Sequence, residues 1–563
     1  MSYTNSYLAQ PKYGYDTVVA VTQKALNNAI ENYYKDSATT FTPVTYYFVK
    51  DSSGKPALVD KATLLASYTS NIDPLSVSLS AAQQKTLSIS QFYFAFSFTI
   101  GNPQNDININ YITLTPGSSN IRYYLLCKQL QVAFWNPDTK AWVGFKQAVP
   151  NEADIFANVN LKNVQDNTNL TPAVQAAVDT LGGTDVNIQQ LIFDLDSIAV
   201  DPASVLPKLD STCSVFNPLM EQFAQAYFST YTAQSGALNY AITTQNSASL
   251  VPTKMDWYVG AFVDGNGNAV ASPTEDEENL ATLNYLFATN GDALNTGAQF
   301  NWNWLEDNGS SHNPDLDTNA DVNKYDGAIS INRDAFAKYL DTQLRPYILQ
   351  NWWTPVVTCL TRDTPSLDMD VFVVAIDNII NAVPDGFQSY NGDPSIDQQD
   401  NLLSWTNSSI SQVNGKWNGN DYLKVECYFS FNVQVYRGLI LINQTLEFSA
   451  YENYGGNAYG GPVVLFESRD IFAPVIDDNG NLLLKKDTTG STNSHQVFNT
   501  TFAGVDASFQ TLFNSIALAT FEEMPVSFPQ QFVFPGGNAF TFQDAAFAGK
   551  SDIVCHFTYK AEL

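Results

Sequence analysis

Alternating hydrophobic and polar residues predict β-strands over much of this chain. In the segment 91–100, Phe or Ile occupies every second position, and aromatic and β-branched residues are frequent, which is typical of strands. The turn sequences Asp264–Asn268 and Asp477–Asn481 are rich in Gly and Asn, so each predicts a hairpin between the strand-like runs on its two sides. The glycine-rich segment Asn453–Gly461 predicts a flexible loop.

Two amphipathic helices are predicted, and each follows a short β-like run. Thr22 can cap a helix over Gln23–Tyr34, and Asn332 can cap a helix over Arg333–Arg345 that ends before Pro346. The apolar residues recur at the spacing of one helical face. They are Leu26, Ala29, Ile30 and Tyr33 in the first helix and Phe336, Tyr339, Leu340 and Leu344 in the second.

These two strand–cap–helix segments resemble each other, which predicts an internal repeat. Placing Val21 on Ile331 aligns cap with cap, and it aligns Ala25 with Ala335, Leu26 with Phe336 and Ile30 with Leu340. Further apolar helix faces are predicted around 216–231 and 509–521, each followed by strands. The sequence therefore predicts one module at 1–305, an acidic polar linker at 306–326 and a second module at 327–563.

Composition and charge exclude several classes of protein. The chain has 563 residues with 56 Asp and Glu against 27 Lys and Arg, so its formal net charge is 27 − 56 = −29. This balance excludes a general nucleic-acid binder, because such affinity comes mainly from basic residues that neutralise phosphates. Hydrophobic residues make up 44% of the chain, which is enough for a large core and excludes a long disordered protein.

The cysteines and the apolar runs indicate where the protein is made. Five widely spaced cysteines form no C-x-x-C motif, so we expect buried free thiols rather than disulfides or a structural zinc site. No apolar run reaches the ~20 residues of a membrane-spanning helix, and the first residues show no Sec-type signal. We expect the protein to be synthesised in the cytoplasm and, if it is exported, to be released by a non-Sec route. We do not expect it to be an integral membrane protein.

Catalytic motifs are not found in the sequence. The chain has only three histidines, His312, His495 and His556, and none lies in a recognisable catalytic motif. For His556, which alternates with apolar neighbours, a strand residue that faces solvent or makes a hydrogen bond is a better interpretation than a metal ligand. The prediction is a non-enzymatic protein that needs no cofactor.

One acidic stretch has a spacing similar to that of a calcium-binding loop. Carboxylate and amide side chains alternate in it, as in an EF-hand: Asp315, Asp317, Asn319, Asp321 and, at the twelfth position, Asp326. Two departures weaken the match, because Ala320 stands where the turn needs Gly and Asp326 is shorter than the usual bidentate Glu. No helix is predicted before the stretch, so a solvated linker is the preferred interpretation and a weak cation site is the alternative.

The segment from Tyr13 to Val21, Tyr-Gly-Tyr-Asp-Thr-Val-Val-Ala-Val, leads into the first capped helix. It resembles the opening of the tubular lipid-binding (TULIP) superfamily, in particular the forty-seven-kilodalton and OrfX-type accessory proteins encoded beside clostridial neurotoxins. Those proteins typically begin Tyr-Gly-Trp-Asp-Thr-Val, and Tyr15 replaces the Trp here. Leu283–Leu286 followed by Phe300–Trp304, and Ala328–Phe336, are further points of similarity. None of these motifs supplies a catalytic residue.

The resemblance implies an α+β fold of two TULIP-like modules, each a long amphipathic helix wrapped by a strongly curved antiparallel sheet. It also implies an apolar groove between helix and sheet that takes up a lipid or other hydrophobic ligand. The helix residues expected to border that groove are Leu26, Ile30, Phe336 and Leu340. Other toxin-cluster proteins are the implied partners. The alternative is a structural component of a toxin complex that docks proteins or glycans and has no open groove.

Overall fold

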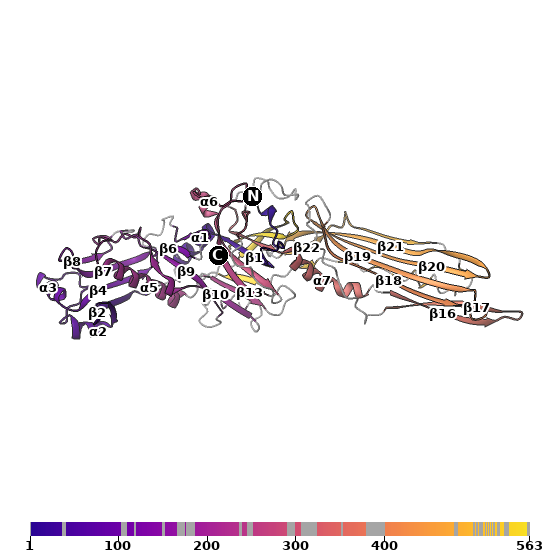
Figure 1. Cartoon of the computed structure of the whole chain (residues 1–563), viewed down its shortest axis with the longest axis horizontal. Helices are drawn as coiled ribbons and strands as arrows, with labels where there is room; N and C mark the ends of the chain where they lie inside the picture. The colour runs from indigo at the N-terminus through magenta and orange to yellow at the C-terminus, as the bar shows by residue number, and fades with distance from the viewer. Residues whose placement is uncertain are drawn as a thin grey trace.

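The computed structural model describes most of the chain, and everything below refers to that part. The described residues are 2–35, 41–102, 110–117, 120–148, 152–165, 175, 179, 186–235, 239–244, 252–289, 299–305, 324–350, 353–378, 400–477, 482–498, 502, 505, 511, 512, 514, 516, 518, 521, 524, 525, 530–533 and 540–559. The fold is mixed α and β with antiparallel sheets, as the sequence predicts. It is elongated, with a wing on either side of a central sheet (Figure 1).

The central sheet contains strands from both halves of the chain. Its six antiparallel strands follow the order β13-β14-β1-β15-β27-β26. Their bounds are Pro252–Gly260, Thr282–Thr289, Thr17–Thr22, Gly327–Ile331, Ile553–Tyr559 and Phe540–Phe547. The two strands at the middle, β1 and β15, are the two short runs that precede the predicted helices.

The antiparallel pairing of these two middle strands is centred on two residues that the sequence alignment of the halves also matches. The alignment places Val19 on Ile329, and these residues are Cα partners in the β1–β15 pair. Around this pair the order of strands is symmetric, with a hairpin-like pair of strands on each side. The two strand–helix units are therefore related by a local two-fold arrangement. The domain bounds stay a prediction, since the linker residues 306–323 lie outside the described residues.

The N-terminal wing, elements β2 to β12, contains two sheets and helix α5 (Phe216–Ser235). The first sheet has the order β3-β2-β4-β7-β8: Pro56–Val59, Val44–Lys50, Phe92–Ile100, Cys127–Asn136 and Ala141–Lys146. The second has the order β25-β12-β10-β9-β6-β5, with β11 (Ala199–Val200) beside β9: Gln530–Val533, Asn239–Thr244, Val186–Phe193, Phe156–Gln165, Asn120–Tyr124 and Ile112–Leu114. Strand β25 comes from the C-terminal half, so the halves also pair here.

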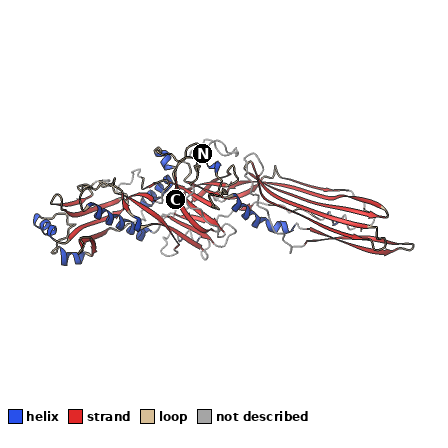
Figure 2. Ribbon diagram, viewed as in Figure 1, coloured by secondary structure: helices blue, strands red, loops and turns tan. Residues whose placement is uncertain are grey.

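Short helical segments lie before and between the strands of the N-terminal wing and the central sheet (Figure 2). They are η1 (Tyr3–Asn5), α2 (Lys61–Thr63) followed by a π-helical turn (Leu64–Tyr68), α3 (Ala81–Ile89), η3 (Leu195–Ser197) and α6 (Glu275–Asn279). No helix in the described part of the chain is both long and apolar enough to cross a membrane.

The C-terminal wing, elements β16 to β24, consists of long strands (Figure 1). Its large sheet has the order β18-β19-β20-β21-β22-β24, with β23 (Thr492–Val497) beside β21: Asp400–Asn414, Tyr422–Tyr436, Leu439–Tyr454, Asn457–Ile476, Leu482–Lys486 and Met524–Pro525. A separate hairpin is formed by β16 (Trp353–Asp363) and β17 (Asp368–Asn378).

Both predicted helices are present, with one difference in length. Helix α1 spans Gln23–Lys35, whereas α7 spans Arg333–Gln350 and continues through Pro346, where the sequence predicts an end. Proline in a helix interior loses a hydrogen bond and costs about 3 kcal/mol. The apolar face continues beyond it, from Leu344 before the proline to Ile348 after it, and the burial of both side chains offsets the cost. The helix predicted around 509–521 lies mostly outside the described residues.

One expected hairpin forms, the other is only a closed turn, and the expected loop at 453–461 is wrong. Strand β21 pairs with β22 as predicted. The Asp264–Asn268 turn closes with a hydrogen bond from Asp264 N to Asn268 O (2.8 Å), but only an isolated Val263–Ala269 bridge flanks it and residues 269–272 form no strand. At 453–461, strands β20 and β21 instead continue to a two-residue turn, Gly455-Gly456, with φ of 59° and 83°. Glycine adopts positive φ readily, so this pair favours a tight hairpin over a long loop.

Candidate functional site

The four residues predicted to border a groove are all buried. Leu26 and Ile30 lie on α1, and Phe336 and Leu340 lie on α7, within one large apolar cluster. The predicted caps orient both helices, since Ala25 N donates to Thr22 Oγ1 (3.1 Å) and Asp334 N donates to Asn332 Oδ1 (2.8 Å). An open groove beside these side chains stays a prediction.

A concave apolar site lies beside the first turn of α1, and we name it the α6 pocket. Its volume is about 320 Å³. Strand β5 and its following residues form one wall, and the segment between β13 and β14, including α6, forms the other. The lining residues are Thr113, Leu114, Pro116, Ala261, Phe262, Val270, Ala271, Pro273, Glu277, Glu278 and Ala281.

Gln23, the first residue of α1, connects the two walls of the α6 pocket. Its backbone N donates to Ala281 O (2.8 Å), and its side-chain Oε1 accepts from Leu114 N (2.7 Å). Its Nε2 is buried and has no hydrogen-bond partner among the described residues. The pocket is therefore positioned by the same helix whose apolar face was predicted to line a ligand groove.

Two local turns hold the outer wall of the pocket. The carboxylate of Asp264 accepts hydrogen bonds from the backbone N of Asn266 (2.8 Å) and Asn268 (2.9 Å), which fixes the hairpin before Val270. Thr274 and Glu277 form a reciprocal capping box at the start of α6. The Glu277 carboxylate is thus occupied by Thr274, while Glu278 remains exposed at the rim.

A second, more polar pocket of about 390 Å³ lies on the N-terminal wing. It lies between the loop before α3 and strands β7 and β8, and its walls include Trp142, Gln84, Gln131, Ser78 and Lys146. Gln131 Nε2 donates to Leu75 O (2.6 Å), and this hydrogen bond holds the Gln131 amide against the loop before α3.

The motif Tyr13–Thr17 connects the two halves at the central sheet. Asp16 accepts hydrogen bonds from Thr289 N and Thr289 Oγ1, both at 2.6 Å, and its backbone O accepts from Asn332 N (2.8 Å). Asn332 Nδ2 also donates to Tyr15 O (2.9 Å). The motif that carries the family resemblance is therefore a structural junction.

The aromatic run Phe300–Trp304 packs into this junction. Phe300, Trp302 and Trp304 are buried in one cluster with Tyr13 and Tyr15, so the run has a packing role. Residues 300–304 form no strand in the structure. Close ring contacts hold the segment in place of a sheet ladder.

His556 makes buried hydrogen bonds, as one of its two predicted interpretations states. Its Nδ1 lies 2.7 Å from Asp544 Oδ1, and its Nε2 lies 3.0 Å from Trp304 O. These two contacts join the imidazole of His556 to strand β26 and to the aromatic run. Burial raises the pKa of Asp544, but the charge of His556 and hydrogen bonds from His556 and Tyr325 outweigh it, and the pKa is lowered.

Asp552 is a second buried carboxyl at the junction, and sequence reasoning missed it. Its Oδ2 accepts from Ser6 Oγ (2.8 Å) and Leu8 N (2.7 Å), and its Oδ1 accepts from Arg333 N (3.1 Å). Burial raises the pKa of Asp552 to about 7. The N-terminal segment, α7 and the C-terminal hairpin therefore meet at one carboxyl group.

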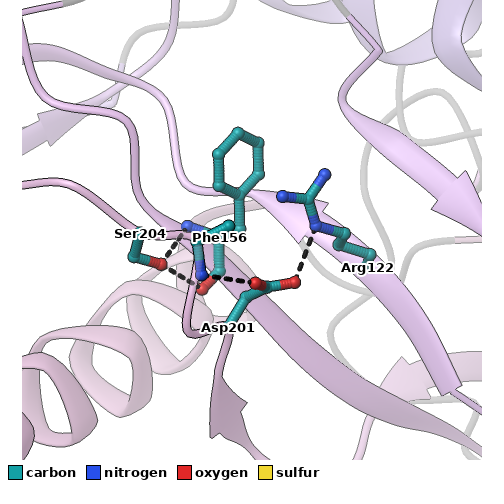
Figure 3. A network of polar contacts seen from close by, with 5 residues as sticks. Arg122, Phe156, Asp201 and Ser204 are labelled. Atoms are coloured by element: carbon teal, nitrogen blue, oxygen red, sulfur yellow. Dashed lines mark hydrogen bonds and ion pairs between the residues drawn. The ribbon is translucent and has the colours of Figure 1, made fainter.

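A polar network in the N-terminal wing is a structural clamp (Figure 3). Arg122 Nε donates to Asp201 Oδ2 (2.8 Å), and the guanidinium lies over the Phe156 ring. Ser204 Oγ accepts from Phe156 N and donates to Phe156 O, both at 3.0 Å. These contacts fasten the loop after β11 to strands β6 and β9. The polar groups of the network are hydrogen-bonded to one another, so the network has a structural role.

The cysteines and the calcium-like stretch are the remaining groups with predicted chemistry. All five cysteines are free and buried, which confirms that prediction. Of the calcium-like stretch, only Asp326 lies within the described residues, and its carboxylate accepts from Tyr559 N (2.8 Å). Asp315, Asp317, Asn319 and Asp321 lie outside them. No cluster of three His, Cys, Asp or Glu residues that could hold a metal occurs in the described part of the chain.

Comparisons with known proteins identify similar solved structures. No family model matches the chain. No curated protein matches it by sequence. It is similar to P47 from Clostridium botulinum A2, with 11% identity, a TM-score of 0.40 and coverage of 97% of this chain and 98% of that one. It is also similar to P47 of Clostridium botulinum E1, with 11% identity, a TM-score of 0.42 and coverage of 97% and 100%.

A third similar structure is a lipopolysaccharide binding protein, with 9% identity, a TM-score of 0.28 and coverage of 97% of this chain and 99% of that one. At these identities and TM-scores, the likenesses do not identify a ligand of this chain.

Proposed function

We propose that this chain is a non-enzymatic protein that binds one small hydrophobic molecule or lipid chain in the α6 pocket. We further propose that each half forms a tubular module in which a helix packs inside a curved sheet. The observation that carries the proposal is an apolar concave site fixed by Gln23 at the start of α1. Pockets of this kind, with apolar walls and few polar groups, are the usual sites of small-molecule binding.

The volume limits the size of the ligand. Ligand pockets in proteins span about 300–1,000 Å³, so a pocket of about 320 Å³ is at the small end of that range. It suits a single alkyl chain or a compact apolar molecule rather than a whole two-chain lipid. A larger lipid would need further space beside the buried faces of α1 or α7.

The charge at the rim limits the head group. Helix α6 has four acidic residues in its first turn, Glu275, Asp276, Glu277 and Glu278, and no basic residue in its last turn. Glu278 is exposed at the pocket, and the whole chain carries −29. A carboxylate or phosphate head would be repelled there, whereas an amine or an uncharged hydroxyl would be accepted.

The test is calorimetric titration with three probes of equal chain length: dodecylamine, dodecanol and dodecanoate. We expect binding near one molecule per chain, with dodecanoate weaker than dodecylamine by about tenfold, equivalent to about 1.4 kcal/mol. Ala271→Trp, which fills the pocket from an exposed wall position, should weaken dodecanol binding by at least about tenfold.

The matched control is Ala269→Trp, two positions away on the same hairpin and outside the pocket wall. It should bind the probes like the unmodified protein. Equal binding by Ala271→Trp and the unmodified protein would place any ligand elsewhere, and no binding of any probe would refute the proposal. Glu278→Gln should bring the affinities for dodecanoate and dodecylamine closer together.

A second candidate function is recognition of a glycan in the polar pocket of the N-terminal wing. The observation that favours it is an indole, Trp142, among amide, hydroxyl and ammonium groups, which can stack on and hydrogen-bond to a sugar. This function belongs to the interaction-protein alternative. An accessory role beside a bacterial toxin stays a prediction from the sequence motifs.

A further inference from the structure

Three hairpin turns meet at the far end of the C-terminal wing. The hairpins β16–β17 and β20–β21 end at the right of Figure 1, and the turn between β18 and β19 is hydrogen-bonded to both. We name this end the distal tip and define it by Leu360, Leu367, Trp417 and Tyr459. The turn residues themselves are Thr364–Leu367, Gly415–Asp421 and Gly455-Gly456.

A buried carboxylate holds the first two turns together. Asp370, near the start of β17, accepts hydrogen bonds from three successive backbone N–H groups across the tip: Lys416 (2.8 Å), Trp417 (2.8 Å) and Asn418 (2.9 Å). Burial raises the pKa of Asp370, but these N–H donors and the Cys359 thiol outweigh it, and the pKa is lowered. The backbone around Trp417 is therefore fixed in place.

A second carboxylate connects the third turn. Asp421 Oδ1 accepts from Gly455 N (3.1 Å) and from Asn418 Nδ2 (3.0 Å), and Asn453 Nδ2 donates to Asn420 O (3.0 Å). Asp370 and Asp421 are both buried. The three turns form one rigid unit, so their outward side chains have fixed positions.

This rigid unit exposes large apolar side chains. Exposed fractions are 48% for Leu360, 56% for Leu367, 50% for Trp417 and 49% for Tyr459. Among the described residues, seven of the twelve large exposed hydrophobic side chains lie between Leu360 and Tyr459. Isolated exposed apolar residues are normal, but a group held rigid at one end of the molecule indicates a contact surface.

The charges and the shape of the distal tip indicate the kind of partner. The exposed ionised side chains beside it balance, with Arg362 and Lys416 against Asp363 and Asp368. The buried carboxylates of Asp370 and Asp421 lie behind them, so the formal net charge of the tip is 2 − 4 = −2 on a chain of −29. The tip combines Trp, Tyr and Leu with Arg and Lys, and this combination is typical of protein segments at membrane–water interfaces. A protein partner would need a broad surface of about 800 Å² on this chain, whereas a few side chains on turn ends can enter a bilayer interface.

We propose that the distal tip docks on an uncharged, phosphatidylcholine-type bilayer surface, with Leu367 and Trp417 entering the interface. The net negative charge of the chain and of its tip disfavours anionic membranes, whereas a phosphatidylcholine surface has no net charge that would repel the tip. Docking would use the end of the molecule opposite the polar pocket of the N-terminal wing, and it is independent of ligand binding in the α6 pocket.

The test is flotation of the full chain with phosphatidylcholine vesicles. We expect the unmodified protein to float with the vesicles. The double variant Leu367→Ser, Trp417→Ser should lose at least about tenfold in partitioning, because neither serine gains from leaving water. Adding phosphatidylglycerol should weaken the flotation of the unmodified protein. Quenching by brominated phosphatidylcholine should be smaller in Trp417→Phe.

The matched control is Val77→Ser with Ile89→Ser, two strongly exposed apolar side chains on the N-terminal wing. Its flotation should equal that of the unmodified protein, and all variants should keep the same circular dichroism spectrum. An unmodified protein that does not float overturns the proposal, as does an equal loss in the control. Self-association that is lost in the double variant, without flotation, would assign the tip to a second copy of the chain and also overturn it.

Discussion

Replacing Asp552 with alanine is expected to lower the free energy of unfolding by about 3–5 kcal/mol. The substitution leaves two buried backbone donors, Leu8 N and Arg333 N, without their acceptor, and Ser6 Oγ keeps only its contact with Ser330 Oγ (3.0 Å). Each unsatisfied buried donor costs about 1–3 kcal/mol. The loss should fall on the junction between the N-terminal segment, α7 and the C-terminal hairpin, so η1 should become accessible to proteolysis first.

The stability contributed by Asp552 should also depend on pH. Burial raises its pKa to about 7 in the folded chain, against about 3.9 for an unfolded Asp. Between about pH 4 and 7 the folded chain therefore holds a proton that the unfolded chain releases. The contribution is fully present below about pH 4 and is lost as pH rises through about 7, at about 1.4 kcal/mol per pH unit within that window.

Urea unfolding followed by tryptophan fluorescence at pH 5 and pH 8 measures both effects. The difference between the unmodified protein and Asp552→Ala should be larger at pH 5 by about 2–3 kcal/mol. The matched control, Asp276→Ala, changes an exposed carboxylate and should shift stability by less than about 0.5 kcal/mol at either pH. A difference that is equal at the two pH values would contradict the raised pKa.

Gly327→Ala is expected to destabilise the central sheet by about 3 kcal/mol or more, although it adds only one methyl group. A Cβ at this position would lie 2.3 Å from the backbone O of Ala20 and 2.4 Å from Phe557 Cζ. Ala20 is in β1 and Phe557 is buried in β27, so neither atom can move without disturbing the strands on both sides of β15. Overpacking of this kind typically costs 1–3 kcal/mol, and more when the contact is with the backbone of a central strand.

Thermal unfolding of Gly327→Ala beside Gly419→Ala tests this expectation. A Cβ at Gly419 would meet nothing within 4 Å, and its backbone is not in the left-handed region, so that variant should unfold near the temperature of the unmodified protein. If both variants unfold together, the close approach of β1 and β15 at Gly327 is wrong.

The sequence predicted helices and turns correctly where neighbouring residues alone stabilise them. Thr22 and Asn332 accept from backbone N–H groups within their own first turns, and the apolar stripe of α1 repeats every three or four residues. Such signals need no distant partner, so the strand–cap–helix units, the hairpin before β22 and the tight turn at Asp264–Asn268 could be predicted. Pro346 led to a wrong helix end, because the burial of residues further along α7 decided the length of that helix. Gly455-Gly456 led to a wrong loop, because the positive φ angles of the two glycines form a tight turn.

The tertiary structure alone decided how the halves meet and where a ligand could bind. The alignment of Val19 with Ile329 is visible in the sequence, but nothing in it says that these residues pair across one sheet. Asp552, His556 and the distal tip depend on partners far away in the chain, such as Ser6, Trp304 and Gly455. The α6 pocket likewise joins β5 to the segment around α6, more than a hundred positions later. Long-range contacts follow from register and packing, which no local period of hydrophobic residues encodes.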